Sequence, residues 1–251
     1  MAHETPAIET NNLRKEYPDT VAVNGISLSV DYGTIFGLLG PNGAGKTTTM
    51  RMLTTLTQPT AGTARIDGIA IEQQETVRSR IGFLPENPPI HDELSGREQL
   101  EYVAKLRDVP PTAREERIET YLNRLDLDAA DSRISTYSKG MRQKIGLIQT
   151  LLHEPNVVFL DEPTSGLDPR AAKQMQEIIE ELAAEETTIV LSTHILPVVD
   201  KLADRVGVVH DGDFVAEAAP DEIKSRAGTE GNESLEDAFL SITRDSRPPA
   251  K

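Results

Sequence analysis

The stretch Gly40-Pro41-Asn42-Gly43-Ala44-Gly45-Lys46-Thr47 decides how this chain folds and what it can bind. It follows an apolar run, Ile35–Leu39, that is typical of a buried strand, and it precedes a run that favours a helix. Glycines let successive backbone N–H groups converge on phosphate oxygens, and the positive end of the following helix attracts the same anion. The stretch therefore matches a phosphate-binding loop, or P-loop, whereas a glycine-rich turn that matches by chance would lack this context.

The side chains at the end of this loop predict its ligand. In a P-loop the lysine, here Lys46, neutralises charge on the terminal phosphates, and the hydroxyl that follows, here Thr47, is a ligand for Mg²⁺. We therefore expect ATP and Mg²⁺ to be bound by the residues from Gly40 to Thr48.

A pair of acids, Asp161-Glu162, follows a second apolar run, Val157–Leu160. Such a run is expected for a central parallel strand that is buried on both faces, and ligands gather at the carboxyl ends of these strands. We expect Asp161 to hold Mg²⁺ directly or through water, and Glu162 to act as the general base that activates a water molecule. The alternative is an ordinary solvated pair of loop acids.

The sequence on both sides of the middle region is predicted to be rich in β-strands. Short β-type runs separated by turn residues such as Asn24-Gly25 fill residues 7–39. Asp67-Gly68 and Asp211-Gly212 are two-residue hairpin signals. Thr188–Ser192 is expected to be a further strand.

The middle of the chain is predicted to be helical. Ser95-x-x-Glu98 and Thr112-x-x-Glu115 are capping boxes that each predict the start of a helix. A third helix is expected to begin near Ser138, so that residues from about 88 to 154 form a helical insertion between the β-rich flanks.

Two further helices are expected after the insertion. Asp168-Pro169 supplies an N-cap and a proline at the first helical position. The acidic tail is expected to be helical near Ser234–Thr243 and frayed beyond Arg244. Together the patterns predict an α/β P-loop NTPase fold with a mostly parallel core sheet, an antiparallel β subdomain and an inserted helical subdomain.

Composition restricts the possible partners. The 26 basic and 41 acidic residues give a net charge of −15, and no basic run is present, so nucleic acid is not an expected partner. Cysteine is absent, which excludes disulfides and thiolate metal sites. No apolar run approaches the ~20 residues of a membrane-spanning helix. The acidic N-terminus does not resemble a secretory signal, so we expect the chain to stay in the cytosol.

The charge balance has two possible explanations. Only 9 of the 26 basic residues are lysine and 17 are arginine. An acidic surface with few lysines suits a concentrated salt cytosol, where salt screens charge repulsion. An ordinary acidic cytosolic protein is the alternative, and the sequence leaves both open.

Over about residues 7–218 the chain resembles the nucleotide-binding subunit of an ATP-binding cassette (ABC) transporter. Besides the P-loop and the Asp161 strand, four family motifs have counterparts in the expected order: an adenine-stacking aromatic at Tyr17, the signature at Ser138-Lys139-Gly140-Met141-Arg142-Gln143, the D-loop at Ser165-Gly166-Leu167-Asp168 and the switch histidine at His194. Leu94-Ser95-Gly96-Arg97-Glu98 is similar to the signature by letter but lies too early, and its Ser95 is better explained as a helix cap.

The resemblance implies roles for these residues. Ser138, Gly140 and Asp168 would contact nucleotide, and His194 would act with Glu162 and Lys46 in catalysis. Packing of Tyr17 against the β-rich subdomain and simple exposure of His194 at a strand end are the alternatives.

Two departures from the family pattern stand out. Glu86 replaces the glutamine that many members have at this point, where it would contact Mg²⁺ or its water unless it is an ordinary loop acid. Lys139 and Met141 replace a glycine and the glutamine of the signature, although Ser138 and the N–H groups of the helix end keep their capacity to bind phosphate.

The resemblance also implies partners. The signature of one subunit closes on the ATP held by the P-loop of another, so we expect pairing with a second copy or a related ATPase subunit. Separate transmembrane permease subunits would place the chain at the cytoplasmic face of the cell membrane and couple ATP hydrolysis to transport, with export favoured by similarity to multidrug and antibiotic-resistance members.

The expected domain organisation follows the same resemblance. Residues 1–218 would form the ABC ATPase domain, with the helical subdomain of about 88–154 inserted, and residues 219–251 a C-terminal helical extension and frayed tail. A soluble ABC-superfamily ATPase without a membrane partner is the alternative function, although such members usually carry two cassettes or a long coiled coil. A GTPase would need an Asn-Lys-x-Asp motif, which is absent.

Overall fold

A central sheet of mostly parallel strands organises the molecule. The computed structural model describes residues 5–227 and 234–245. The sheet contains, in spatial order, β11 (Asp213–Ala218), β10 (Arg205–His210), β4 (Ile35–Leu39), β9 (Thr188–Thr193), β8 (Val157–Asp161) and β7 (Ile81–Leu84). All neighbouring pairs are parallel except β10 and β11, which form a hairpin.

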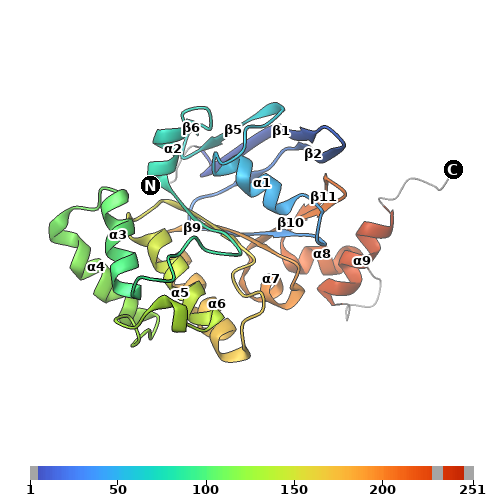
Figure 1. Cartoon of the computed structure of the whole chain (residues 1–251). Helices are drawn as coiled ribbons and strands as arrows, with labels where there is room; N and C mark the ends of the chain where they lie inside the picture. The colour runs from blue at the N-terminus through green and yellow to red at the C-terminus, as the bar shows by residue number, and fades with distance from the viewer. Residues whose placement is uncertain (1–4, 228–233, 246–251) are drawn as a thin grey trace.

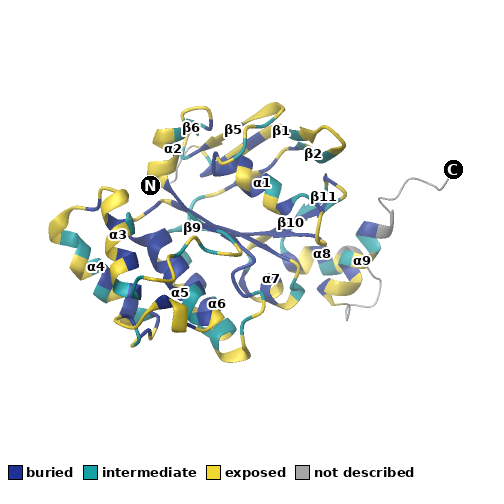
Figure 2. Ribbon diagram, viewed as in Figure 1, coloured by how far each residue is buried: buried dark blue, intermediate teal, exposed yellow. Residues whose placement is uncertain are grey.

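The burial of two strands explains their place at the centre of this sheet. Every residue of β4 and β8 is buried, as expected for strands covered on both faces. Figure 2 shows this buried layer passing through the middle of the molecule. The carboxyl ends of β4, β8 and β9 therefore meet at one edge of the sheet, where the P-loop begins.

A second, antiparallel sheet lies above the first in Figure 1. It consists of β2 (Thr20–Ile26), β1 (Ile8–Tyr17), β5 (Ala61–Ile66) and β6 (Ile69–Ala70), with β3 (Ser29–Val30) paired to β1. Helix α1 (Lys46–Leu53) lies between the two sheets, and one hydrophobic cluster fills this layer. The sheets thus hold the start of α1 at a fixed place beside β4.

Helices cover the opposite face of the central sheet. Between β7 and β8 the chain forms α3 (Gly96–Leu106), α4 (Pro111–Arg124), the short 3₁₀ helix η1 (Ile134–Thr136) and α5 (Lys139–Leu151). A second hydrophobic cluster joins α3, α4 and α5 to α6 (Pro169–Ala184). A third packs α7 (Leu196–Leu202) against α8 (Pro220–Ala227) and α9 (Leu235–Asp245). The short helix α2 (Gln74–Arg80) precedes β7.

The structure confirms most of the predicted turns and helix starts. Asp67 and Gly68 both have positive φ, as do Asp211 and Gly212, as a two-residue hairpin turn requires. Ser95 and Glu98 form the predicted capping box of α3. Asp168 caps α6, and Pro169 occupies its first position.

Two turn and cap predictions were wrong. Thr112 does not cap α4, because the helix begins one residue earlier, at Pro111, and Pro110 is its N-cap without a side-chain hydrogen bond. Asn24-Gly25 does not reverse the chain. It lies inside β2, where the register to β1 shifts and the positive φ of Gly25 is accommodated in a bulge.

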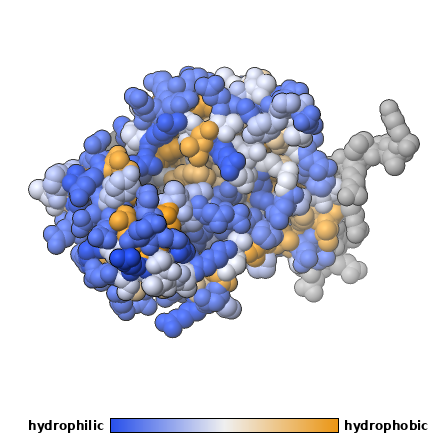
Figure 3. Space-filling view, viewed as in Figure 1, coloured by the Kyte–Doolittle hydropathy of each residue, from blue (hydrophilic) through white to orange (hydrophobic). Residues whose placement is uncertain are grey.

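The surface is polar, and no described helix could span a membrane. Figure 3 shows a face dominated by hydrophilic residues with small apolar patches between them. Within residues 5–227 and 234–245, the helices lack the length and apolarity that crossing a bilayer requires. The predicted fraying beyond Arg244 falls mainly on residues 246–251, outside the described part of the chain.

Candidate functional site

The P-loop forms a glycine-lined turn between β4 and α1. Gly45 is the N-cap of α1 with a φ of 111°, and Gly43 has a φ of 84°. A Cβ on Gly40 would lie 2.3 Å from the Val209 carbonyl oxygen, and one on Gly45 would lie 2.5 Å from that of Ala22. The loop is therefore packed closely against β10 and β2, and only glycine fits at these two positions.

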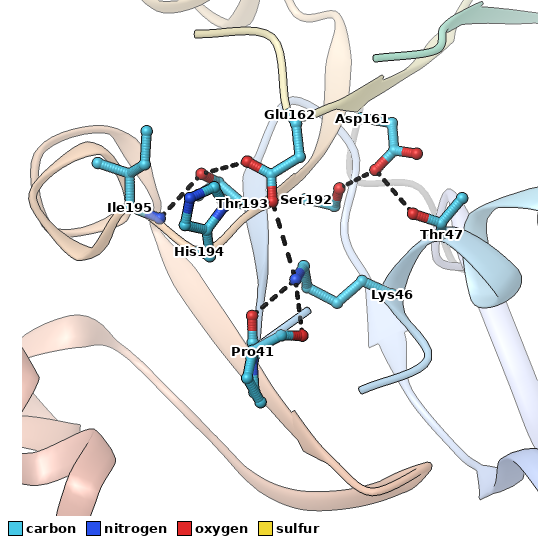
Figure 4. Close-up of polar contacts among 10 residues, drawn as sticks. Pro41, Lys46, Thr47, Asp161, Glu162, Ser192, Thr193, His194 and Ile195 are labelled. Atoms are coloured by element: carbon cyan, nitrogen blue, oxygen red, sulfur yellow. Dashed lines mark hydrogen bonds and ion pairs between the residues drawn. The ribbon is translucent and has the colours of Figure 1, made fainter. Parts of the chain in front are cut away.

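Lys46 is buried and directed back over this loop. Its Nζ donates hydrogen bonds to the carbonyl oxygens of Gly40 at 2.6 Å and Pro41 at 3.1 Å, as Figure 4 shows. It also lies 3.8 Å from Glu162 Oε1. Burial lowers the pKa of Lys46, and the nearby carboxylates of Glu162 and Asp161 oppose this shift. A desolvated ammonium that is held by neutral carbonyls is well suited to exchange them for phosphate oxygens.

Asp161 lies at the buried tip of β8. The hydroxyls of Thr47 and Ser192 both donate to its Oδ1, the first over 3.3 Å. Thr47 and Asp161 thus place two oxygen ligands side by side, which fits Mg²⁺ because this ion is usually held by one or two protein oxygens plus substrate phosphates. In the described part of the chain, no group of three or more acidic or histidine side chains is arranged to hold a metal.

Glu162 is held from three sides. Its Oε1 accepts from His194 Nδ1 at 2.8 Å, its Oε2 accepts from the Thr193 hydroxyl at 3.1 Å, and Lys46 lies on its remaining side (Figure 4). Its φ of 51° is uncommon for a residue other than glycine. The backbone N–H of Glu162 donates to the Ser192 carbonyl, which anchors this conformation. The carboxylate is therefore fixed in direction, as a general base needs.

A cleft of about 480 Å³ brings most of the predicted residues together. Its lining includes, from the predicted set, Pro41, Asn42, Gly43, Gly45, Lys46, Thr47, Thr48, Glu86, Glu162 and His194. Ala22 and Ser165 complete the lining. Gly40, Ala44 and Asp161 are buried behind this surface.

The remaining predicted residues lie elsewhere on the chain. Tyr17 ends β1 and is 40% exposed, with Lys15 Nζ 5.1 Å from its ring centre. Ser138 caps α5 by accepting from the Met141 N–H, and Gly140 lies in the first turn of that helix. Asp168 caps α6. None of these four residues lines the cleft of its own chain.

Sequence reasoning missed two residues that orient the acids. Ser192 bonds to Asp161 and Thr193 bonds to Glu162 because β8 and β9 are parallel and pair Asp161 with Ser192. The polar residues that end the apolar strand of 188–192 were the available signal. Gln143, in α5, makes a different contact: its amide donates to the backbone carbonyl of Glu86 at 3.4 Å.

Comparisons with known proteins agree with this geometry. A family model described as ABC transporter matches residues 23–165. The chain is 40% identical over 227 residues to the daunorubicin/doxorubicin resistance ATP-binding protein DrrA of Streptomyces peucetius, covering 90% of this chain and 69% of that protein. It is 39% identical over 222 residues to the bacitracin transport ATP-binding protein BcrA of Enterococcus faecalis, covering 87% and 71%.

Solved structures give the same result. A structure described as the ATP-binding subunit of an ABC transporter superposes with a TM-score of 0.86 at 30% identity, covering 94% of this chain and 99% of that one. A dimeric ATP-binding cassette, MJ0796, bound to ADP and Pi has a TM-score of 0.78 at 22% identity, covering 84% and 98%, and so shows likeness of fold alone.

Proposed function

The chain belongs to the ABC transporter family as an ATP-hydrolysing subunit of the drug- and antibiotic-resistance branch, and from this premise we propose that two copies enclose ATP and Mg²⁺ between them to power a separate membrane permease. The observation that carries the proposal is the convergence of Lys46, Asp161, Glu162 and His194 at one edge of the parallel sheet.

Each site residue of one chain has a separate role in binding ATP or in its hydrolysis. Lys46 and the N–H groups at the start of α1 bind the phosphates of ATP. Thr47 and Asp161 would hold Mg²⁺, with Glu86 close to its water shell, and the ion neutralises phosphate charge when it is bound. Glu162 accepts a proton from the attacking water, and His194 keeps the carboxylate directed at that water. Tyr17 stacks on adenine at the edge of the β subdomain.

A second copy supplies the residues that complete the nucleotide site of the first. Ser138, Gly140 and Asp168 lie outside the cleft of their own chain, and both Ser138 and Asp168 mark helix N-termini that can face an anion. We assign them to the nucleotide held by the partner. The likeness in fold to a dimeric cassette with bound ADP and Pi supports pairing. A related ATPase chain could take the place of the second copy.

The membrane partner is proposed from the relatives. DrrA and BcrA are described by their names as ATP-binding proteins of drug resistance and of bacitracin transport. We propose that this chain likewise docks at the cytoplasmic face of the membrane on a permease and powers export. Co-purification with a hydrophobic protein of about six spans, each of ~20 residues, from a neighbouring reading frame would support this, and a chain that hydrolyses ATP but captures no such protein would favour a soluble ATPase.

Two substitutions test the catalytic proposal. Glu162→Gln removes the base but keeps the shape, so we expect turnover to fall by at least about 100-fold while ATP stays bound and the chain becomes a dimer. Lys46→Ala is expected to lose ATP binding, as measured by calorimetry. A Glu162→Gln variant that binds ATP yet stays monomeric at every salt concentration would exclude the paired site, and unchanged ATP affinity of Lys46→Ala would exclude the P-loop.

A further inference from the structure

The loop of residues 85–90 links β7 to the helical insertion and carries Glu86 into the nucleotide cleft. Three of its six residues are Pro85, Pro88 and Pro89, which have no backbone N–H to donate. In the described chain, no hydrogen bond between backbone groups outside the helices and strands involves a residue of this loop. Contacts with neighbouring elements therefore set the position of the loop.

Helix α5 packs closely against this loop and the strand before it. A Cβ placed on Gly146 of α5 would lie 2.6 Å from Pro88 Cγ. A Cβ placed on Gly82 of β7 would lie 2.6 Å from Thr150 Cγ2. Gly146 and Thr150 lie on the same face of α5 as Gln143, because residues three and four positions apart are neighbours on a helix surface. One face of α5 thus supports both β7 and the loop that follows it.

Gln143 makes the polar contact on this face. Its side chain is 1% exposed, and its amide donates to the backbone carbonyl of Glu86 at 3.4 Å. A buried amide costs free energy unless it is hydrogen-bonded, so this contact accounts for the polar side chain at a buried position. Gln149, also buried on α5, differs from Gln143 because it accepts from Gln99 and makes no hydrogen bond to Glu86.

The side chain of Glu86 faces the residues that are proposed to carry out the chemistry. Glu86 lines the same cleft as Lys46 and Glu162. Burial lowers the pKa of Lys46, and the charge of Glu86 is among those that oppose this shift. A displacement of the loop would therefore change the charge around Lys46 and the place where Mg²⁺ is proposed to bind.

We propose that Gln143 is a positioning residue for ATP hydrolysis, whose amide holds the loop of residues 85–90 on α5 so that the Glu86 carboxylate points into the cleft. The inference rests on the proposed function, which places Glu86 close to the water shell of Mg²⁺. Gln143 does not line the cleft, so it acts through Glu86 and not on the nucleotide.

The first test is a double-mutant cycle on ATP hydrolysis. Gln143→Leu removes the amide and keeps an apolar side chain of similar size in the buried position. We expect it to lower kcat by about fivefold to tenfold, as for loss of one hydrogen bond, while KM for ATP changes by less than about twofold. Because both changes act through one loop, Glu86→Ala should lower kcat little further in this variant. The control Gln149→Leu removes a buried amide from the same helix, and its effect should add to that of Glu86→Ala.

The second test follows the loop itself and requires no turnover. The chain contains no cysteine, so Asn87→Cys provides a single site for a nitroxide label at an exposed position of the loop. In electron paramagnetic resonance spectra recorded without ATP and Mg²⁺, we expect the label to be more mobile in Gln143→Leu than in the parent. Gln149→Leu should leave its mobility unchanged.

The outcomes separate this inference from the proposed function. Equal mobility of the label in Gln143→Leu and its parent would overturn the inference, as would effects of Gln143→Leu and Glu86→Ala that add fully. Slow hydrolysis by Glu86→Ala with parent-like hydrolysis by Gln143→Leu would overturn the inference alone. Parent-like hydrolysis by Glu86→Ala would contradict the role that the proposed function gives to Glu86, and the inference with it.

Discussion

At the scale of single residues, two glycines of the P-loop are needed for different physical reasons. A Cβ on Gly40 would meet the Val209 carbonyl at 2.3 Å, which is backbone and cannot move away cheaply. A Cβ on Gly43 would meet nothing within 4 Å, but its φ of 84° is strained for any other residue. Gly40 is required because there is no room for a side chain, and Gly43 is required because other residues rarely adopt its backbone conformation.

This difference gives a matched pair of variants. We expect Gly40→Ala to cost about 3 kcal/mol of unfolding free energy from overpacking. Gly43→Ala should cost about 1–2 kcal/mol from left-handed backbone. Each kcal/mol lowers the melting temperature of a chain of this size by about 2–4 °C, so thermal unfolding resolves the order. A Gly43→Ala variant that melts below Gly40→Ala would contradict the packing of the loop against β10.

How well the candidate site could be predicted depends on how local each signal is. Lys46 and Glu162 belong to contiguous motifs, and the structure places both in one cleft. Ser192 and Thr193 have their roles only because β9 runs parallel to β8 in one particular register. Such a register is set by packing of whole strands and cannot be read from the residues themselves.

At the scale of secondary structure elements, the two capping patterns of the helical insertion had different outcomes. In α3, Ser95 Oγ accepts from Glu98 N–H at 3.2 Å and Glu98 accepts from Ser95 N–H at 2.8 Å. In α4, the same spacing of residue types at Thr112 makes no such cap, because the fixed φ of Pro111 starts the helix first.

Substitution of the two hydroxyl residues should therefore differ in effect. Ser95→Ala is expected to lose about 1 kcal/mol of unfolding free energy with its cap. Thr112→Ala should stay within about 0.5 kcal/mol of the parent, since its side chain caps nothing. Denaturant unfolding measures both. Equal losses would show that Thr112 does cap α4 in solution.

The elements that sequence patterns missed are short ones. Both α2 and α7 have seven residues and no side-chain cap, so neither shows a full amphipathic period or a start signal. The starts of longer helices with a cap signal were predicted correctly, as for α5 after Ser138 and α6 after Asp168. Tertiary packing, rather than local preference, determines the short helices.

At the scale of the whole molecule, the acidic surface is partly organised into shared ion pairs. Arg97 binds Glu119 and Asp131, and Arg124 binds Glu181 and Glu185. Each of these two arginines thus pairs with two carboxylates, in a chain with 26 basic and 41 acidic residues. The net charge of −15 remains, and the excess carboxylates repel one another in dilute buffer.

Salt should therefore stabilise this chain. We expect the melting temperature to rise between dilute buffer and molar KCl, because the Debye length falls to about 3 Å and screens the repulsion. A sodium chloride series of equal ionic strength controls for specific ions. Greater stability in dilute buffer would show that the exposed ion pairs outweigh the repulsion, and would contradict adaptation to a salt-rich cytosol.

In the proposed function, two copies of the chain share each bound triphosphate. The most direct measurement is a crystal structure of Glu162→Gln grown with ATP and Mg²⁺. We expect each triphosphate to contact Lys46 of one copy and Ser138 of the other, with the ion between Thr47 and Asp161. A triphosphate that lies away from residues 40–48, or that contacts one copy alone, would contradict it.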